Sequence, residues 1–135
     1  MVSHVFGHVG LNHFVANAML LLLVGPLLEE KYGSNTILKI IILTAFFSGV
    51  VHWIFGGNTV LCGASGIVFC FITLSSFTKV ENGEIPLTFI LVFVLYIGQE
   101  IYNGIVIQDN ISNLTHIVGG IVGGVFGHYF NKNVL

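Results

Sequence analysis

The 135-residue chain carries very little charge. It has no arginine, and its four lysines and six acidic residues make up 7% of the sequence, whereas hydrophobic residues make up 55%. A soluble domain usually has about a quarter of its residues charged. The apolar content excludes a disordered chain, and the net charge of -2 excludes electrostatic binding of nucleic acid. The length predicts a single domain, residues 1–135.

Charge is also absent over long stretches. No formal charge occurs in the 39 residues of segment 40–78. This is roughly twice the 20 or so residues that a helix needs to cross a bilayer. The segment before the first apolar run has no basic residue, so a signal peptide is not expected. The pattern predicts a polytopic membrane protein.

Apolar runs separated by polar turns predict an all-α bundle of five transmembrane helices. The turns contain Gly, Asn and charged residues, and Pro86 falls in the first turn of one helix, where its missing N–H costs nothing. The five predicted spans are 11–28, 37–55, 63–77, 85–105 and 111–130.

Lysine positions predict the orientation of this bundle. Five crossings place the termini on opposite sides, and with Met1 outside all four lysines fall at cytoplasmic helix ends, as the positive-inside rule requires. We therefore expect a multi-pass protein with its N-terminus outside and its C-terminus in the cytoplasm. The four residues are Lys31, Lys39, Lys79 and Lys132.

Several polar side chains fall at one depth in the predicted bilayer. Four lie 12 to 16 residues from the charge at the inner end of their helix, which corresponds to about 18 to 24 Å. They are His13, Asn17, Ser65 and His116. His52 and Glu100 reach similar depths, so depth alone does not select a site. Ionisable groups within a membrane are costly and are candidate functional groups.

Ser65 lies between glycines, in the sequence Cys62-Gly63-Ala64-Ser65-Gly66. It is predicted to begin a short helix, where backbone N–H groups and the helix dipole favour a developing oxyanion. Taken alone, this pattern is more typical of close helix packing by small residues.

His116 is followed by glycines on one face of the last predicted helix. These are Gly119, Gly120, Gly123, Gly124 and Gly127. A face of nearly bare backbone allows another helix to approach closely, and the glycine-flanked start of the Ser65 helix is the expected partner. That packing would bring His116 and Ser65 within hydrogen-bond reach, although a histidine bonded to a backbone carbonyl is an equally good interpretation.

His13 and Asn17 are four residues apart and share a helical face, so they can direct two donors to one point. A lone intramembrane Asn is more often a contact between helices. His4 and His8 suggest a metal site with His13 as third ligand. The five-residue step from His8 to His13 turns the second ring off a shared helical face, so we expect neither a metal nor another cofactor.

The ordered motifs resemble the rhomboid family of intramembrane serine proteases. The similarity covers essentially the whole chain. It rests on His8-x4-His13-x3-Asn17, Gly63-Ala64-Ser65-Gly66 and His116-x2-Gly119-x3-Gly123, with support from Gly25-Pro26-Leu27-Leu28-Glu29 and Tyr32-Gly33-Ser34.

The resemblance implies an endopeptidase with a Ser-His dyad. Ser65 would be the nucleophile and His116 the general base. His13, Asn17 and the Ser65 backbone N–H would bind the oxyanion. The substrate would be a transmembrane segment of another protein, entering from the bilayer past the fourth helix and cut near a small residue.

Two departures from the family pattern stand out. Phe69 occupies a position where the family commonly has a tyrosine that packs on the histidine. The family core has six spans, and its first span is absent here, so we expect a fragment or a five-span form. The alternative function is therefore an inactive rhomboid-like protein that binds transmembrane helices.

Overall fold

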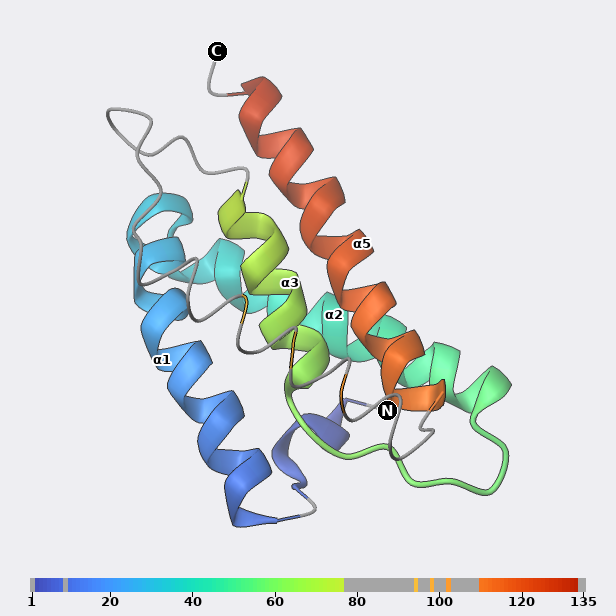
Figure 1. The fold of residues 1–135 in the computed structure, drawn as a ribbon. Helices are drawn as coiled ribbons and strands as arrows, with labels where there is room; N and C mark the ends of the chain where they lie inside the picture. The colour runs from blue at the N-terminus through green and yellow to red at the C-terminus, as the bar shows by residue number, and fades with distance from the viewer. Residues whose placement is uncertain are drawn as a thin grey trace.

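The computed structural model describes residues 2–8, 10–76, 94, 98, 102 and 110–133. These residues form helices, and no strand occurs among them. A short 3-10 helix, η1 (Ser3–Phe6), precedes two long helices, α1 (Leu11–Tyr32) and α2 (Ser34–Phe55). The shorter α3 (Ser65–Ser76) and the long α5 (Asn110–Asn133) complete the described fold (Figure 1).

Four of the predicted helices therefore exist, with shifted ends. Helix α1 continues four residues past the predicted 11–28, and α2 begins three residues before the predicted 37–55. Helix α3 is shorter than the predicted 63–77, whereas α5 is longer than 111–130. The predicted helix 85–105 lies outside the described residues except at three positions, so the count of five spans stays a prediction.

Two of the described helices are long and apolar enough to cross a membrane, namely α1 and α2.

Helices α1 and α2 are separated by a single residue, Gly33, rather than by the predicted polar loop. Gly33 has a φ of 83°, a conformation that favours glycine, and its N–H donates to the Glu29 carbonyl at 2.8 Å. Ser34 then starts α2 and donates its hydroxyl to Glu29 Oε1 at 2.5 Å.

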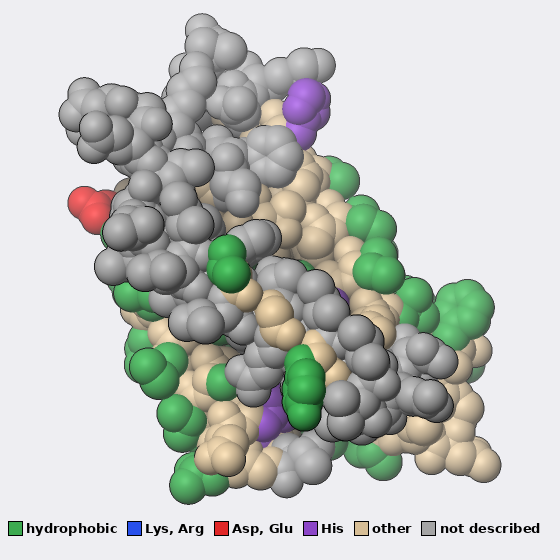
Figure 2. All heavy atoms as spheres, in the orientation of Figure 1, with side chains coloured by type: hydrophobic (Ala, Val, Ile, Leu, Met, Phe, Trp, Pro, Cys, Tyr) green, Lys and Arg blue, Asp and Glu red, His purple; other side chains and the backbone are tan. Residues whose placement is uncertain are grey.

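Helix α3 is the centre of the bundle and contacts α1, α2 and α5. Most of its residues are buried, including Val68, Cys70 and Leu74. In Figure 1, α3 lies between α1 and α5 while α2 crosses behind it. A helix that is apolar on all sides is stable in this central position, whereas α1 and α2 expose many large apolar side chains. Figure 2 shows exposed hydrophobic side chains, in green, along the left and right edges of the view.

The contact between α3 and α5 is made largely through glycine. A Cβ atom at Gly119 would overlap the Gly66 carbonyl, and one at Gly123 would overlap the Cys70 carbonyl. The two backbones therefore touch, as predicted from the glycine stripe of α5. At the far end of this contact, the rings of Tyr32 and Phe130 stack at 4.8 Å and join α1 to α5.

Candidate active site

Ser65 is the first residue of α3, as the sequence predicted. It is 8% exposed. The first backbone hydrogen bond of the helix runs from Val68 N–H to the Ala64 carbonyl at 3.0 Å. The N–H groups of Ser65, Gly66 and Ile67 precede that bond and are not used within the helix. Ser65 therefore combines a hydroxyl with the positive end of a helix dipole.

Gly63 brings α1 next to this helix start. Its φ of 113° favours glycine. A Cβ there would lie 2.7 Å from His13 Cε1, 3.2 Å from His13 Nε2 and 3.8 Å from Asn17 Nδ2. Both side chains of the predicted donor pair thus face the backbone two residues before Ser65. Asn17 is 1% exposed, so its amide is buried at this point.

His116 is on α5 and lies against α3. Its ring stacks on Phe69, with 4.5 Å between ring centroids and 14° between ring planes. Phe69 is one turn after Ser65 on α3. His116 is 5% exposed, and its imidazole is buried at the α3–α5 contact.

Backbone contacts on either side of His116 define the same meeting point. The preceding residue, Thr115, has its carbonyl oxygen 3.4 Å from where a Cβ of Gly66 would lie. Gly119, nearly one turn after His116, touches the Gly66 backbone. Since Gly66 directly follows Ser65, these contacts put His116 beside the first turn of α3.

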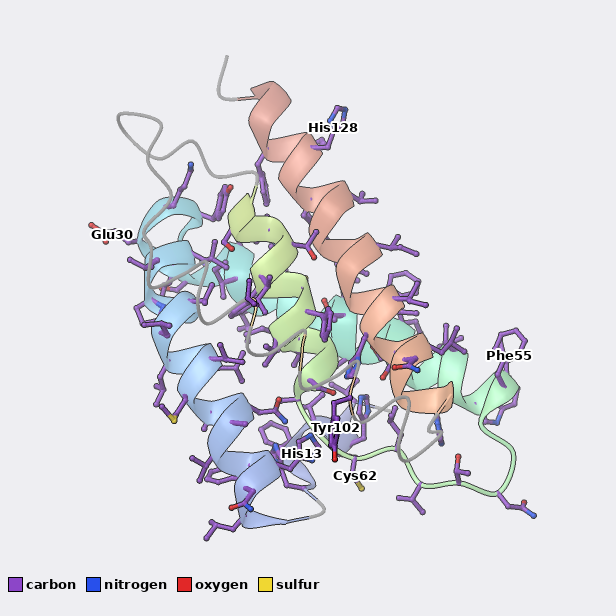
Figure 3. The ribbon with its side chains drawn as sticks, viewed as in Figure 1. His13, Glu30, Phe55, Cys62, Tyr102 and His128 are labelled. Atoms are coloured by element: carbon purple, nitrogen blue, oxygen red, sulfur yellow. The ribbon has the colours of Figure 1, made fainter. Side chains whose placement is uncertain are left out.

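The predicted site residues thus come from three helices to one end of the bundle. His13 and the neighbouring Cys62 lie at that end, whereas Glu30 and His128 lie at the other (Figure 3). The site combines a hydroxyl, an imidazole and several hydrogen-bond donors in a buried setting. Helix α5 itself contains no carboxylate. This set of groups is suited to nucleophilic attack on a carbonyl with stabilisation of the resulting oxyanion.

Two polar residues that the sequence did not single out lie beside Ser65. Ser48 of α2 and Thr115 of α5 line a small cavity of about 10 Å³ that also touches Ser65, Gly63 and Gly66. Ser48 is 2% exposed and Thr115 is 4% exposed. The cavity is near the minimum size that holds one water molecule. In the sequence, both look like ordinary small polar residues on apolar helices.

His4, His8 and His13 are the candidate metal ligands near the N-terminus. Among the residues that the structure describes, no group of three His, Cys, Asp or Glu side chains could hold a metal ion. The expectation that helical spacing turns the His8 and His13 rings apart was wrong. His8 precedes α1, and its ring packs edge-on against His13 with 5.3 Å between centroids.

The other candidates at similar depth are placed differently. His52 is near the end of α2, and its Nε2 lies 3.0 Å from the Thr59 carbonyl oxygen. It therefore contacts the loop before α3 rather than Ser65 itself. Glu100 lies outside the described residues.

Comparison with known proteins gives a consistent family match. A sequence model described as the Rhomboid domain matches residues 1–133. The chain is 32% identical to Rhomboid-related protein 1 of Caenorhabditis elegans, over 98% of this chain and 40% of the relative. It is 29% identical to Rhomboid protease GlpG of Serratia proteamaculans, over 90% of this chain and 44% of the relative.

A second bacterial relative extends the match. Rhomboid protease GlpG of Yersinia pseudotuberculosis serotype I is 27% identical over 98% of this chain and 48% of the relative. The chain thus spans less than half the length of these curated relatives. No solved structure matches significantly.

Proposed function

The chain belongs to the rhomboid family, and we propose that it is a serine endopeptidase that cleaves transmembrane segments of other proteins within the bilayer. The apolar helices and the family make it an integral membrane protein. Residues 1–135 would act as one rhomboid-like membrane domain, with the N-terminus outside and the C-terminus in the cytoplasm. In that orientation Ser65 lies toward the outer surface.

The reaction would use Ser65 and His116 as a dyad. His116 takes the proton of the Ser65 hydroxyl as its oxygen attacks the scissile carbonyl, and later returns a proton to the leaving amine. The oxyanion is stabilised by the Ser65 N–H and by His13 and Asn17. The acyl-enzyme is then hydrolysed by water, which regenerates Ser65. No metal or other cofactor takes part in this scheme.

One observation carries the proposal: His116 stacks on Phe69, one helical turn from Ser65. This contact supports a position for the imidazole on the face of α3 that presents the hydroxyl. The fixed ring of Phe69 limits the rotation of His116, which favours a preorganised base. Burial of the base, the nucleophile and Asn17 further strengthens the electrostatic contributions of the site.

The experiment is cleavage in reconstituted vesicles. The purified chain is mixed in liposomes with a single-span peptide rich in Ala and Gly near its outer end, and products are identified by mass spectrometry. We expect the native chain to cut the peptide at one main position and the Ser65→Ala variant to leave it intact. Crosslinking of intact peptide to both proteins without any cut would instead establish the inactive, helix-binding alternative.

A further inference from the structure

The middle of the loop that leads to Ser65 has little burial to fix its position. Residues 56–64 connect α2 to α3. Figure 3 labels Phe55, the last residue of α2, and Cys62, which lies in the second half of the loop. Residues 57–60 are exposed, whereas Gly56, Gly63 and Ala64 are buried. An exposed loop segment samples many conformations unless hydrogen bonds restrict it.

Hydrogen bonds attach this loop at two points. At its C-terminal end, Gly63 N–H donates to the His4 carbonyl at 3.0 Å. At its start, the His52 ring is 3.0 Å from the Thr59 carbonyl. Because a carbonyl only accepts, His52 Nε2 must carry the proton and donate it.

The His52 ring packs closely against Gly56. Gly56 N–H donates to the His52 carbonyl at 2.6 Å, and Thr59 N–H donates to the Gly56 carbonyl at 3.1 Å. A Cβ at Gly56 would lie 2.6 Å from His52 Cε1 and 2.7 Å from Nδ1. The ring therefore fits only against glycine, between the end of α2 and the turn that Thr59 closes.

We propose that His52 is a positioning residue for the active site. Its hydrogen bond to Thr59 restrains loop 56–64, which keeps Gly63 against His13 and directs the Ser65 N–H toward the oxyanion. The catalytic part of this inference rests on the proposed function, because it takes Ser65 as the nucleophile. The structural part concerns the loop alone and can be measured separately.

The rate at which Cys62 is labelled measures the mobility of the loop independently of catalysis. Cys62 is a partly exposed free thiol within the loop, and its Sγ is 3.6 Å from where a Cβ of Gly7 would lie, whereas Cys70 is fully buried. His52→Phe preserves the ring volume but removes the donor, and His52→Gln restores a donor. We expect maleimide to label Cys62 several-fold faster in His52→Phe than in the native chain and in His52→Gln. Cys62→Ser confirms the origin of the signal.

The second readout is reaction of Ser65 with a fluorophosphonate at increasing concentration. His52→Phe should lower the limiting rate constant about tenfold or more, since small misplacements of reacting groups are costly. The half-saturating concentration should not change, and His52→Gln should recover most of the rate. His128→Phe, an exposed histidine at the other end of the bundle, should match the native chain.

The outcomes separate the two proposals. Native rates at both Cys62 and Ser65 in His52→Phe would overturn the positioning role, and so would faster labelling of Cys62 with an unchanged rate at Ser65. Absence of any reaction at Ser65 in the native chain would refute the proposed function, while the Cys62 rates still decide whether His52 restrains the loop. If His52→Phe does not fold, His52→Leu, which also lacks a donor, carries the same expectations.

Discussion

The imidazole of His116 lies nearly parallel to the ring of Phe69, with 4.5 Å between centroids and 14° between planes. This contact crosses from α5 to α3 and is one turn from Ser65. The sequence marked Phe69 as a departure from the tyrosine common in the family. The geometry indicates that the ring itself supplies the packing surface for the histidine, so the hydroxyl is not needed for the stack.

Removing the Phe69 ring should therefore impair the site, whereas adding a hydroxyl should not. Aromatic stacking is worth about 0.5 to 1.5 kcal/mol beyond burial. We expect Phe69→Ala to lower the rate of Ser65 phosphonylation roughly tenfold, and Phe69→Tyr to stay within about twofold of the native rate. Labelling kinetics in detergent measure both. A native rate in Phe69→Ala would show that the stack does not position His116.

Asn17 provides a test of the proposed oxyanion site. Its buried amide faces Gly63 together with His13. Loss of one oxyanion donor typically costs about 10²–10³ in turnover. We expect Asn17→Ala to reduce cleavage of a transmembrane peptide by about 10- to 1000-fold. Asn12→Ala, on an exposed position of the same helix, is the control, and equal losses in the two variants would argue against a role for Asn17.

Gly63 should not tolerate any side chain. A Cβ would approach the His13 ring to 2.7 Å in a backbone conformation that favours glycine. We expect Gly63→Ala to slow Ser65 phosphonylation by about 10²-fold, because His13 or the loop must move. Gly10→Ala, where a Cβ meets nothing within 4 Å, should react like the native chain. Similar rates in both variants would mean that the Gly63–His13 contact is unimportant.

The glycine face of α5 should show strong position dependence in stability. A Cβ at Gly119 would overlap the Gly66 carbonyl, whereas one at Gly120 would lie 3.7 Å from Thr73 Oγ1, an ordinary contact. We expect Gly119→Ala to destabilise the bundle by about 2 kcal/mol or more, as overpacking does. Gly120→Ala should be neutral or slightly stabilising. Thermal unfolding in detergent distinguishes them, and equal melting temperatures would contradict direct backbone contact.

The glycine pattern predicted the contact between α3 and α5, whereas the charges misplaced the end of α1. A Cβ at Gly119 or Gly123 would overlap the backbone of α3, as expected for a glycine face that packs on the Ser65 helix. The charges at Glu29, Glu30 and Lys31 suggested a loop, but they lie on the last turn of α1 because its end is set by Gly33. Exposed charges at the end of a long apolar helix do not interrupt its backbone hydrogen bonds.

Long-range contacts explain what the sequence did not reveal. His8 was expected to turn away from His13, yet α1 starts only at Leu11, so helical spacing does not apply to it. Ser48 and Thr115 meet at a cavity beside Ser65 only because α2 and α5 pack on the same glycine of α3. The role of His52 depends on a contact with a loop carbonyl. None of these contacts leaves a periodic signal.

The proposed reaction depends on Ser65 as a nucleophile that is activated by His116. Its most direct test is reaction of the detergent-purified chain with a fluorophosphonate, followed by mass spectrometry of the labelled peptide. We expect one adduct, on Ser65, which disappears in Ser65→Ala and falls to background in His116→Ala. The absence of an adduct on Ser65, or equal labelling of the native chain and Ser65→Ala, would contradict it.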